Sequence, residues 1–287
     1  MTAAAVDRDL SSQAADAAAL LGDAASAYRT LRDRDRDGEG DGAGPFRVGI
    51  DLGTATCVIV VIDADGRPVW VDSSATAAIR DGVVVDFFGA RDAVAQLKAD
   101  AERAVGIGIR RAGTAFPPGV PRSDAVACRF VLESAGIEEV VLMDEVSAAQ
   151  AALGVVDGVV VDVGGGSTGV GVFREGALVR VDDRPGGGHH LDLILAGALG
   201  IDLAEAEQLK RTDSARYRGV LRPGLERIAS SIEAMSRGDE DLDVHLAGGA
   251  VMIDGSAEVI GAVLGRTVRA YPHSLFITPV GIARTLT

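Results

Sequence analysis

The chain is poor in cysteine, lysine and aromatic side chains, and it has no long apolar run. Its two cysteines, Cys57 and Cys128, lie in apolar segments, one strand-like and one helical, which favours buried reduced thiols over a disulfide. No uninterrupted apolar stretch reaches the ~18–20 residues of a membrane-spanning helix, and the first residues lack the basic-then-apolar order of a secretory signal. These absences predict a cytoplasmic protein.

Positive charge is also scarce. Against 42 acidic residues the chain has 28 basic ones, a net charge of −14, which is the wrong sign for binding nucleic acid or an anionic membrane surface. The only lysines are Lys98 and Lys210, so any phosphate group would have to be held mostly by backbone amides. The chain has no Gly-x-x-x-x-Gly-Lys-Ser/Thr loop and no spaced Cys/His cluster for zinc. We therefore expect neither a P-loop nor a zinc site.

Residues 1–45 differ in kind from the rest. Apolar residues seven apart predict a helix with one narrow apolar stripe within residues 3–31, and the charged, Gly-rich segment 32–44 predicts a flexible linker. We expect residues 1–45 to form a loose amphipathic helix and an acidic, Gly-rich linker. Two interpretations remain open: a frayed extension, or a tethered helix that places its stripe in the groove of a partner.

After Pro45, short β-rich runs alternate with helical ones, a pattern that predicts an α/β fold with mixed sheets covered by helices. The expected strands are 46–51, 56–62, 67–71, 112–116, 139–143, 158–162, 169–173, 177–181 and 244–246. The expected helices are 90–103, 123–135, 145–153, 191–200, 203–211, 223–237 and 279–285, with Pro223 in the first turn of its helix.

The most informative feature is an internal duplication. An apolar strand ends in Asp51 and a Gly/Thr turn leads to a second strand; about 111 residues later the same plan recurs at Asp162, followed by three glycines and Ser167. Such a spacing predicts two similar halves that face each other. Small turn residues let several backbone amides surround a phosphate, and an Asp at a strand end can hold Mg²⁺ through its waters. The two turns together therefore predict a clamp for a nucleoside triphosphate and its metal. His189 and His190 are expected in a loop at a helix start near this cleft, with ligand contact as the alternative.

At these residues the sequence resembles the actin-like ATPase superfamily, which includes sugar kinases, heat-shock chaperones, actin, MreB and FtsA. Five elements occur in the superfamily's order: a first phosphate loop at Asp51–Thr54, a connecting helix at Asp144–Ala149, a second phosphate loop at Asp162–Ser167, an adenosine loop at Leu246–Gly249 and a second connecting helix at Thr278–Ala283. The resemblance implies two similar ribonuclease-H-like lobes around a nucleotide cleft. The first would span residues 46–156 and the second residues 157–287, with the last helix, from about residue 279, returning toward the first lobe.

Within the superfamily the chain looks most like the ethanolamine-utilisation EutJ family. The residues that carry this likeness are Arg80–Asp86, Pro117–Gly119, Glu207–Lys210 and the very small insert between residues 72 and 110. The family is described as chaperone-like and is tied to bacterial microcompartments that house cobalamin-dependent ethanolamine ammonia-lyase. The resemblance implies that this enzyme is a candidate client and that residues 3–31, which look like an encapsulation peptide, contact a microcompartment shell.

The resemblance also implies roles for particular residues. Asp51 and Asp162 would position Mg²⁺ through its waters, and Glu145 would orient the water that attacks the γ-phosphate. ATP or ADP would be held by three groups of residues. The phosphate cradle would be formed by Gly53, Thr54, Ala55, Gly164, Gly165, Gly166 and Ser167. Glu207 and Lys210 would contact the ribose, and Gly248 and Gly249 of the adenosine loop would lie against the adenine. The alternative for Glu207 and Lys210 is an ion pair on the surface of one helix.

Two departures from the superfamily pattern bear on activity. Glu145-Val-Ser stands where the chaperones have Glu-Pro-Thr, and no lysine obviously replaces the one that they place near the γ-phosphate. We therefore expect a slowly hydrolysing ATP-binding chaperone or reactivating factor for a metabolic enzyme. The alternatives are an MreB/FtsA-like nucleotide-dependent filament or scaffold and, with less support, a sugar kinase.

Overall fold

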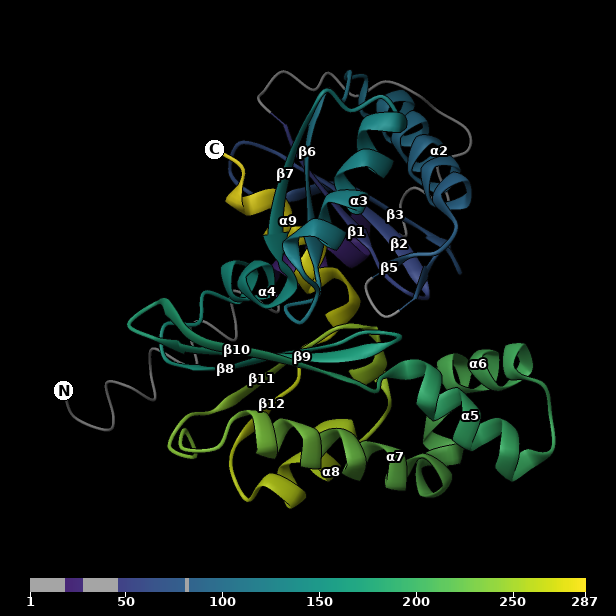
Figure 1. Cartoon of the computed structure of the whole chain (residues 1–287), viewed down its shortest axis with the longest axis vertical. Coiled ribbons are helices and arrows are strands. Elements are labelled where there is room, and N and C mark those ends of the chain that lie inside the picture. Colours follow the sequence, from purple (N-terminus) through teal and green to yellow (C-terminus); the bar gives the residue numbers. More distant parts are fainter. Residues whose placement is uncertain (1–18, 28–45, 81–82) are drawn as a thin grey trace.

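The computed structural model describes residues 19–27, 46–80 and 83–287. Residues 46–287 form two lobes, each built on a five-stranded mixed sheet, which lie one above the other with two helices between them (Figure 1). Within the described residues, no helix combines the length and the apolar character needed to cross a membrane. The predicted two-lobed α/β architecture is confirmed.

The two sheets share one topology, as the duplication predicts. The first has the order β3-β2-β1-β6-β7, formed by β1 (Arg47–Leu52), β2 (Thr56–Ile62), β3 (Pro68–Ala75), β6 (Arg111–Phe116) and β7 (Glu139–Asp144). The second has the order β10-β9-β8-β11-β12, formed by β8 (Gly158–Val163), β9 (Ser167–Arg174), β10 (Ala177–Pro185), β11 (Val244–Ala247) and β12 (Val268–Arg269). In each sheet the first three strands along the chain are antiparallel neighbours, and the last two add in parallel to the first.

Helices cover the outer face of each sheet. The first lobe carries α2 (Phe87–Val105) and α3 (Arg122–Ser134), and the second carries α5 (Gly188–Leu199), α6 (Leu203–Thr212), α7 (Ser214–Met235) and α8 (Ser256–Leu264). Each lobe has its own apolar core between sheet and helices. Cys57 and Cys128 are buried free thiols, as predicted.

Two helices join the lobes. They are α4 (Glu145–Leu153) and α9 (Ile277–Thr285), which cross between the sheets, and α9 also packs against β1, β2 and β6 of the first lobe. Their crossing depends on Gly281, because a Cβ there would lie 1.7 Å from the carbonyl oxygen of Ala148. The two connecting helices therefore touch backbone to backbone.

Some expected elements differ from the structure. Helix α7 starts at Ser214, nine residues before the predicted start, so Pro223 lies inside the helix. A proline there removes the hydrogen bond to the carbonyl of residue 219, but Pro223 and Gly219 are both exposed, so water can solvate that carbonyl. Four of the described strands and α-helices of residues 46–287 had no counterpart among the expected ones: α8, β12 and the short strands β4 (Ile79–Arg80) and β5 (Val83–Val84).

The N-terminal helix also differs from expectation in its described part. Residues 19–27 are helical, but they are not loose: the side chains of Leu21 and Ala24 are 1% and 0% exposed. They belong to the apolar cluster at the junction of the two lobes, since that junction offers an apolar surface on which the stripe can be buried. The remainder of the expected helix and linker, at residues 1–18 and 28–45, lies outside the described residues.

Candidate nucleotide site

The two Asp-containing turns have the same local geometry. In the first, the amide of Gly53 donates to the carbonyl of Thr56 at 3.1 Å; in the second, the amide of Gly164 donates to the carbonyl of Ser167 at 3.0 Å. Each turn therefore spans four residues between the first two strands of its sheet, and in each an Asp lies two residues before the first glycine. The two copies that the sequence repeats therefore form the same backbone hydrogen bond.

The lobes bring the two turns into contact. A Cβ at Gly165 would lie 3.2 Å from the Cβ of Ala55 and 3.3 Å from that of Thr54, so the second turn packs on the first without room for a larger side chain. The amides of Gly188 and His189 donate to the carbonyls of Gly164 and Gly165, which anchors the second turn to the start of α5. Contrary to the expected loop, the two histidines belong to the first turn of α5.

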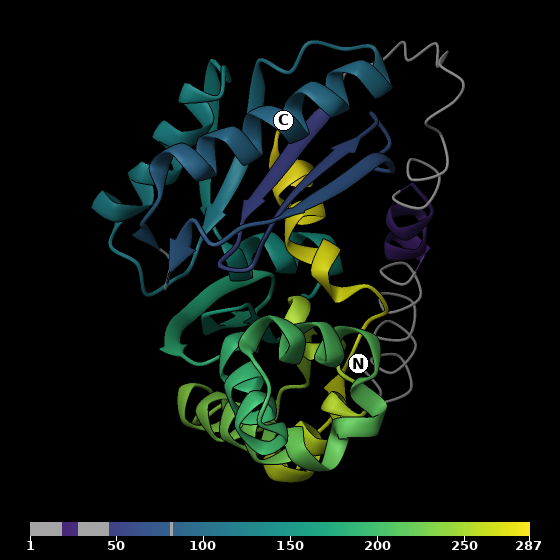
Figure 2. The ribbon, with the colours of Figure 1, turned by 90° about the vertical axis from the view of Figure 1, so that its right-hand side faces the viewer.

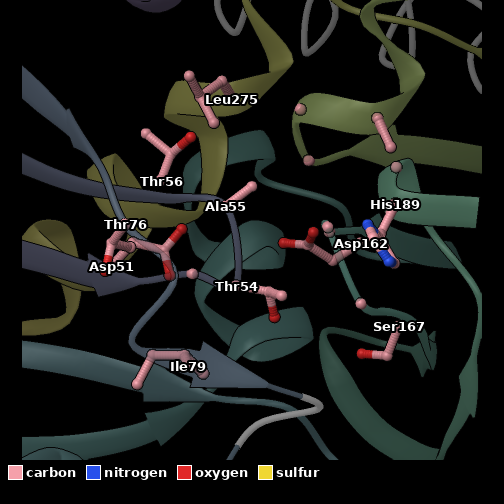
Figure 3. A pocket seen from close by; sticks show the side chains of 18 of the residues that line it. Asp51, Thr54, Ala55, Thr56, Thr76, Ile79, Asp162, Ser167, His189 and Leu275 are labelled. Atoms are coloured by element: carbon pink, nitrogen blue, oxygen red, sulfur yellow. The ribbon is translucent and has the colours of Figure 1, made fainter. Parts of the chain in front are cut away.

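One cavity of about 770 Å³ lies between the lobes beside these turns. All fourteen predicted site residues line it: Asp51, Gly53, Thr54, Ala55, Glu145, Asp162, Gly164, Gly165, Gly166, Ser167, Glu207, Lys210, Gly248 and Gly249. Figure 3 shows the carboxylates of Asp51 and Asp162 pointing toward each other across the cavity, with Thr54 near them. Residues that are more than 100 positions apart in the chain therefore share one site.

The ionised forms of three carboxylates at this site are disfavoured, which raises the pKa of each. Burial and the neighbouring Asp162 raise the pKa of Asp51 from 3.8 to about 7. Burial raises the pKa of Glu145 well above its usual range, with further contributions from Asp162 and Asp51. Burial also raises the pKa of Asp162, although the hydroxyl of Thr278 donates a hydrogen bond to it and acts in the opposite direction. The arrangement favours either a bound proton or a nearby cation.

Glu145 takes its place through a helix cap. The side chain of Asp144 accepts a hydrogen bond from the amide of Ser147 at 2.7 Å, which fixes Asp144 as the residue before α4 and Glu145 as the first residue of the helix. Its carboxylate reaches the cavity that the two turns also line.

The ion pair between Glu207 and Lys210, the alternative to ribose contact, does not occur. Lys210 instead binds Asp192 on α5, with Nζ 2.6 Å from the carboxylate, and donates to the carbonyl of Gly188 at 2.9 Å. Glu207 pairs with Arg211, at 2.6 Å. Arg211 also donates to the hydroxyl of Thr56 at 3.3 Å, and this contact crosses from the second lobe to the first.

Several lining residues were not predicted as site residues. They are Thr56, Thr76, Ile79, Cys128, His189, Asp192, Arg211, Met252, Leu275 and Thr278, among others. Arg211 adjoins the predicted Lys210 and Thr278 opens the predicted second connecting helix, so both carried a signal in the sequence. Asp192 and Leu275 carried none, because only the tertiary fold brings them to the cavity.

The carboxylates of the cavity are suited to a metal ion held through water. Among the described residues, no group of three or more His, Cys, Asp or Glu side chains is arranged to hold a metal ion directly. The raised pKa values of Asp51 and Glu145 nevertheless show carboxylates that lack a compensating positive charge. Such a donor set fits a cation held through its water molecules.

The fold and the paired turns define a protein of the actin-like ATPase superfamily. The lobes match the crystal structure of MreB 5 of Spiroplasma citri bound to AMPPNP, with a TM-score of 0.68 at 17% identity over 82% of this chain and 94% of that one. The family model "Cell division protein FtsA" matches residues 159–281, within the second lobe.

More particularly, the chain belongs to the EutJ family. It is 38% identical to "Ethanolamine utilization protein EutJ" of Escherichia coli K12 over 227 residues, 79% of this chain and 81% of that protein. The crystal structure of EutJ from Carboxydothermus hydrogenoformans matches with a TM-score of 0.86 and 39% identity, over 94% of this chain and 99% of that one.

Proposed function

We propose that the cavity between the lobes binds ATP and ADP together with Mg²⁺. The observation that carries this proposal is the contact between two turns of equal geometry, each two residues after a carboxylate, beside a cavity of about 770 Å³. Backbone amides of the turns would hold the phosphates, since the two basic side chains of the cavity, Lys210 and Arg211, are already paired with acids. Asp51 and Asp162 would orient the waters of the metal, which supplies the positive charge that the phosphates and carboxylates require.

Glu145 would act on water rather than on the nucleotide. At the first position of α4 it lines the same cavity, and burial raises its pKa, so that its carboxylate, once ionised beside a cation, is a stronger base than an exposed glutamate. With no unpaired basic side chain among the cavity residues, the charge that develops on the γ-phosphate is poorly stabilised. Hydrolysis is therefore slow, and the nucleotide acts mainly as a ligand that favours the closed arrangement of the lobes.

The chain would use this cycle as a chaperone-like or reactivating factor for a metabolic enzyme in ethanolamine utilisation. The support is its membership of a family whose relatives are called ethanolamine utilisation proteins. We propose cobalamin-dependent ethanolamine ammonia-lyase as the client, a cytoplasmic location within a bacterial microcompartment, and residues 3–31 as the segment that contacts the shell.

Isothermal titration with ATP and ADP, with and without Mg²⁺, tests the binding proposal. We expect binding of both nucleotides that weakens at least tenfold without the metal, and absence of any heat of binding would refute it. The client proposal requires a second assay, in which inactivated ammonia-lyase regains activity only with this protein and ATP. Equal recovery with the Asp51→Asn variant would contradict a nucleotide-dependent role.

A nucleotide-dependent filament is the second candidate. It is favoured by the likeness of the lobes to MreB 5 and by the FtsA match over residues 159–281. Sedimentation separates the two candidates, because a filament pellets above a critical protein concentration when ATP is added. A protein that stays in the supernatant at all concentrations, while binding ATP, favours the chaperone-like role.

A further inference from the structure

The helix of residues 19–27 buries one face on the body of the protein. The side chains of Leu20 and Leu21 are 6% and 1% exposed. Ala24 and Ala25 follow them four positions later, about one helical turn, and are 0% and 3% exposed. Ala19 and Asp23 are exposed on the opposite side. Four of the nine described residues of this segment are thus buried on one face, which packs against the body of the protein.

The apolar cluster that this face joins draws its residues from both lobes. The cluster that contains Leu20, Leu21, Ala24 and Ala25 includes Val58, Val60 and Val71 from β2 and β3 of the first lobe. It also includes Tyr271 and Phe276, from the coil that leads from β12 to α9. Figure 2 shows the helix, in purple, at the level of the junction between the lobes, near the yellow coil before α9.

The same coil forms one end of the nucleotide cavity. The amide of Gly248 donates to the carbonyl of Ser274 at 3.1 Å, and the hydroxyl of Ser274 donates back to the carbonyl of Gly248 at 2.7 Å. Leu275 lines the cavity and also packs against the cluster that seats the helix. The helix and the adenosine loop therefore share a short segment, residues 271–276.

We infer that residues 19–27 are an internal ligand of this junction, and that their docking and nucleotide binding strengthen each other. The docked helix belongs to an apolar cluster that joins the two lobes in the arrangement in which the phosphate turns touch. A nucleotide in the cavity beside the turns favours that same arrangement, which rests on the proposed function. By linkage, the factor by which nucleotide tightens docking equals the factor by which docking tightens nucleotide binding.

One consequence concerns partners of the N-terminal segment. Leu21 and Ala24 cannot face the protein body and a partner at the same time. A shell or client that takes up the apolar face of this helix must first displace it from the junction. Such a partner would weaken nucleotide binding, and bound nucleotide would weaken the partner.

Hydrogen exchange of the full-length protein tests the docking without any nucleotide. We compare the wild type with Ala24→Asp, which places a charge on the buried face, and with the matched control Ala19→Asp, the same substitution on the exposed face. The amides of residues 20–25 should exchange at least tenfold more slowly in the wild type and in Ala19→Asp than in Ala24→Asp. Amides of β8 report whether each variant remains folded, and Leu21→Ala replaces Ala24→Asp if it does not.

Rapid exchange of residues 20–25 in the wild type would overturn the docking, and so would equal protection in all three proteins. Protection that disappears on dilution would show that the helix sits on a second copy of the chain, which contradicts an internal ligand.

The coupling has its own readout. ADP with Mg²⁺ should slow the exchange of residues 20–25 in the wild type by the same factor by which Ala24→Asp raises the Kd for ADP in calorimetry. If ADP binds and this exchange is unchanged, the coupling is wrong and the proposed function stands. If calorimetry shows no binding of ADP to the wild type, the proposed function fails and the coupling fails with it. The docking is tested separately, by hydrogen exchange without nucleotide.

Discussion

Replacing Asp51 by Asn should stabilise the metal-free protein while impairing its site. Burial and Asp162 raise the pKa of Asp51 from 3.8 to about 7, so the folded protein favours the protonated carboxyl. Between these two values the folded state binds more protons than the unfolded state, and the free energy of unfolding falls as pH rises. At about 1.4 kcal/mol per pKa unit, this pKa shift lowers the free energy of unfolding, relative to its value at low pH, by roughly 2 kcal/mol at pH 5.5 and roughly 4 kcal/mol at pH 8.

The Asn variant has no such ionisation, so its advantage over the wild type should grow by about 2 kcal/mol between pH 5.5 and pH 8. For a chain of this size, the full difference of roughly 4 kcal/mol at pH 8 corresponds to a melting temperature of the Asn variant that is higher by roughly 5–10 °C. The assay is thermal unfolding followed by circular dichroism in EDTA, at several pH values above the sequence isoelectric point of about 4.7. The exposed Asp65 provides the control Asp65→Asn, which should show no comparable pH dependence.

Ligand binding should change in the opposite direction. Loss of a carboxylate that orients metal-bound water should weaken Mg-nucleotide binding by about 10–100-fold, so stability rises while affinity falls. This opposition is the signature of a residue retained for a ligand rather than for folding. A variant that melts at or below the wild type at pH 8, or a difference that is the same at pH 5.5 and pH 8, would refute the reasoning.

Three further substitutions test other parts of the site. Glu145→Gln should retain ATP affinity within about threefold and lower the hydrolysis rate at least tenfold in a phosphate-release assay; an unchanged rate would remove the proposed role in water positioning. Gly165→Val should place methyl groups where the two phosphate turns touch, lowering ADP affinity in calorimetry at least tenfold with little change in melting temperature. Gly281→Ala should destabilise the protein by about 3 kcal/mol or more in thermal unfolding, because its Cβ would meet the backbone of α4, whereas Gly197→Ala, with open space at its Cβ, should be neutral or stabilising.

The sequence predicted what local rules and repetition determine. The turns at Asp51 and Asp162 were recognised because strand, acid, small-residue turn and strand recur in the same order, and that order determines both the hairpin and its hydrogen bonds. The shared sheet topology follows from the same repetition. Strand and helix types were correct through most of residues 46–287 because apolar periodicity there is strong.

What the sequence did not predict depends on tertiary neighbours. Spacing along a helix left open an ion pair between Glu207 and Lys210, but Lys210 is 10% exposed and meets Asp192 from another helix. The sequence predicted that α7 starts at Pro223, since proline suits a first turn. In the structure the helix begins at Ser214, and Tyr217, Val220 and Leu221 pack against the core of the second lobe. The sequence also did not predict the docking of residues 19–27, because a narrow apolar stripe does not specify which surface covers it.

The charge distribution in the cavity explains why a metal and a nucleotide should bind together. Five acidic side chains line it, namely Asp51, Glu145, Asp162, Asp192 and Glu207, and its lysine and arginine are paired with the last two. Three carboxylates are thus left facing the phosphate turns, and a nucleotide alone would add further negative charge there. A ligand that brings its own cation relieves this repulsion, so affinity should depend on Mg²⁺ much more steeply than in a cleft that provides a lysine to the phosphates.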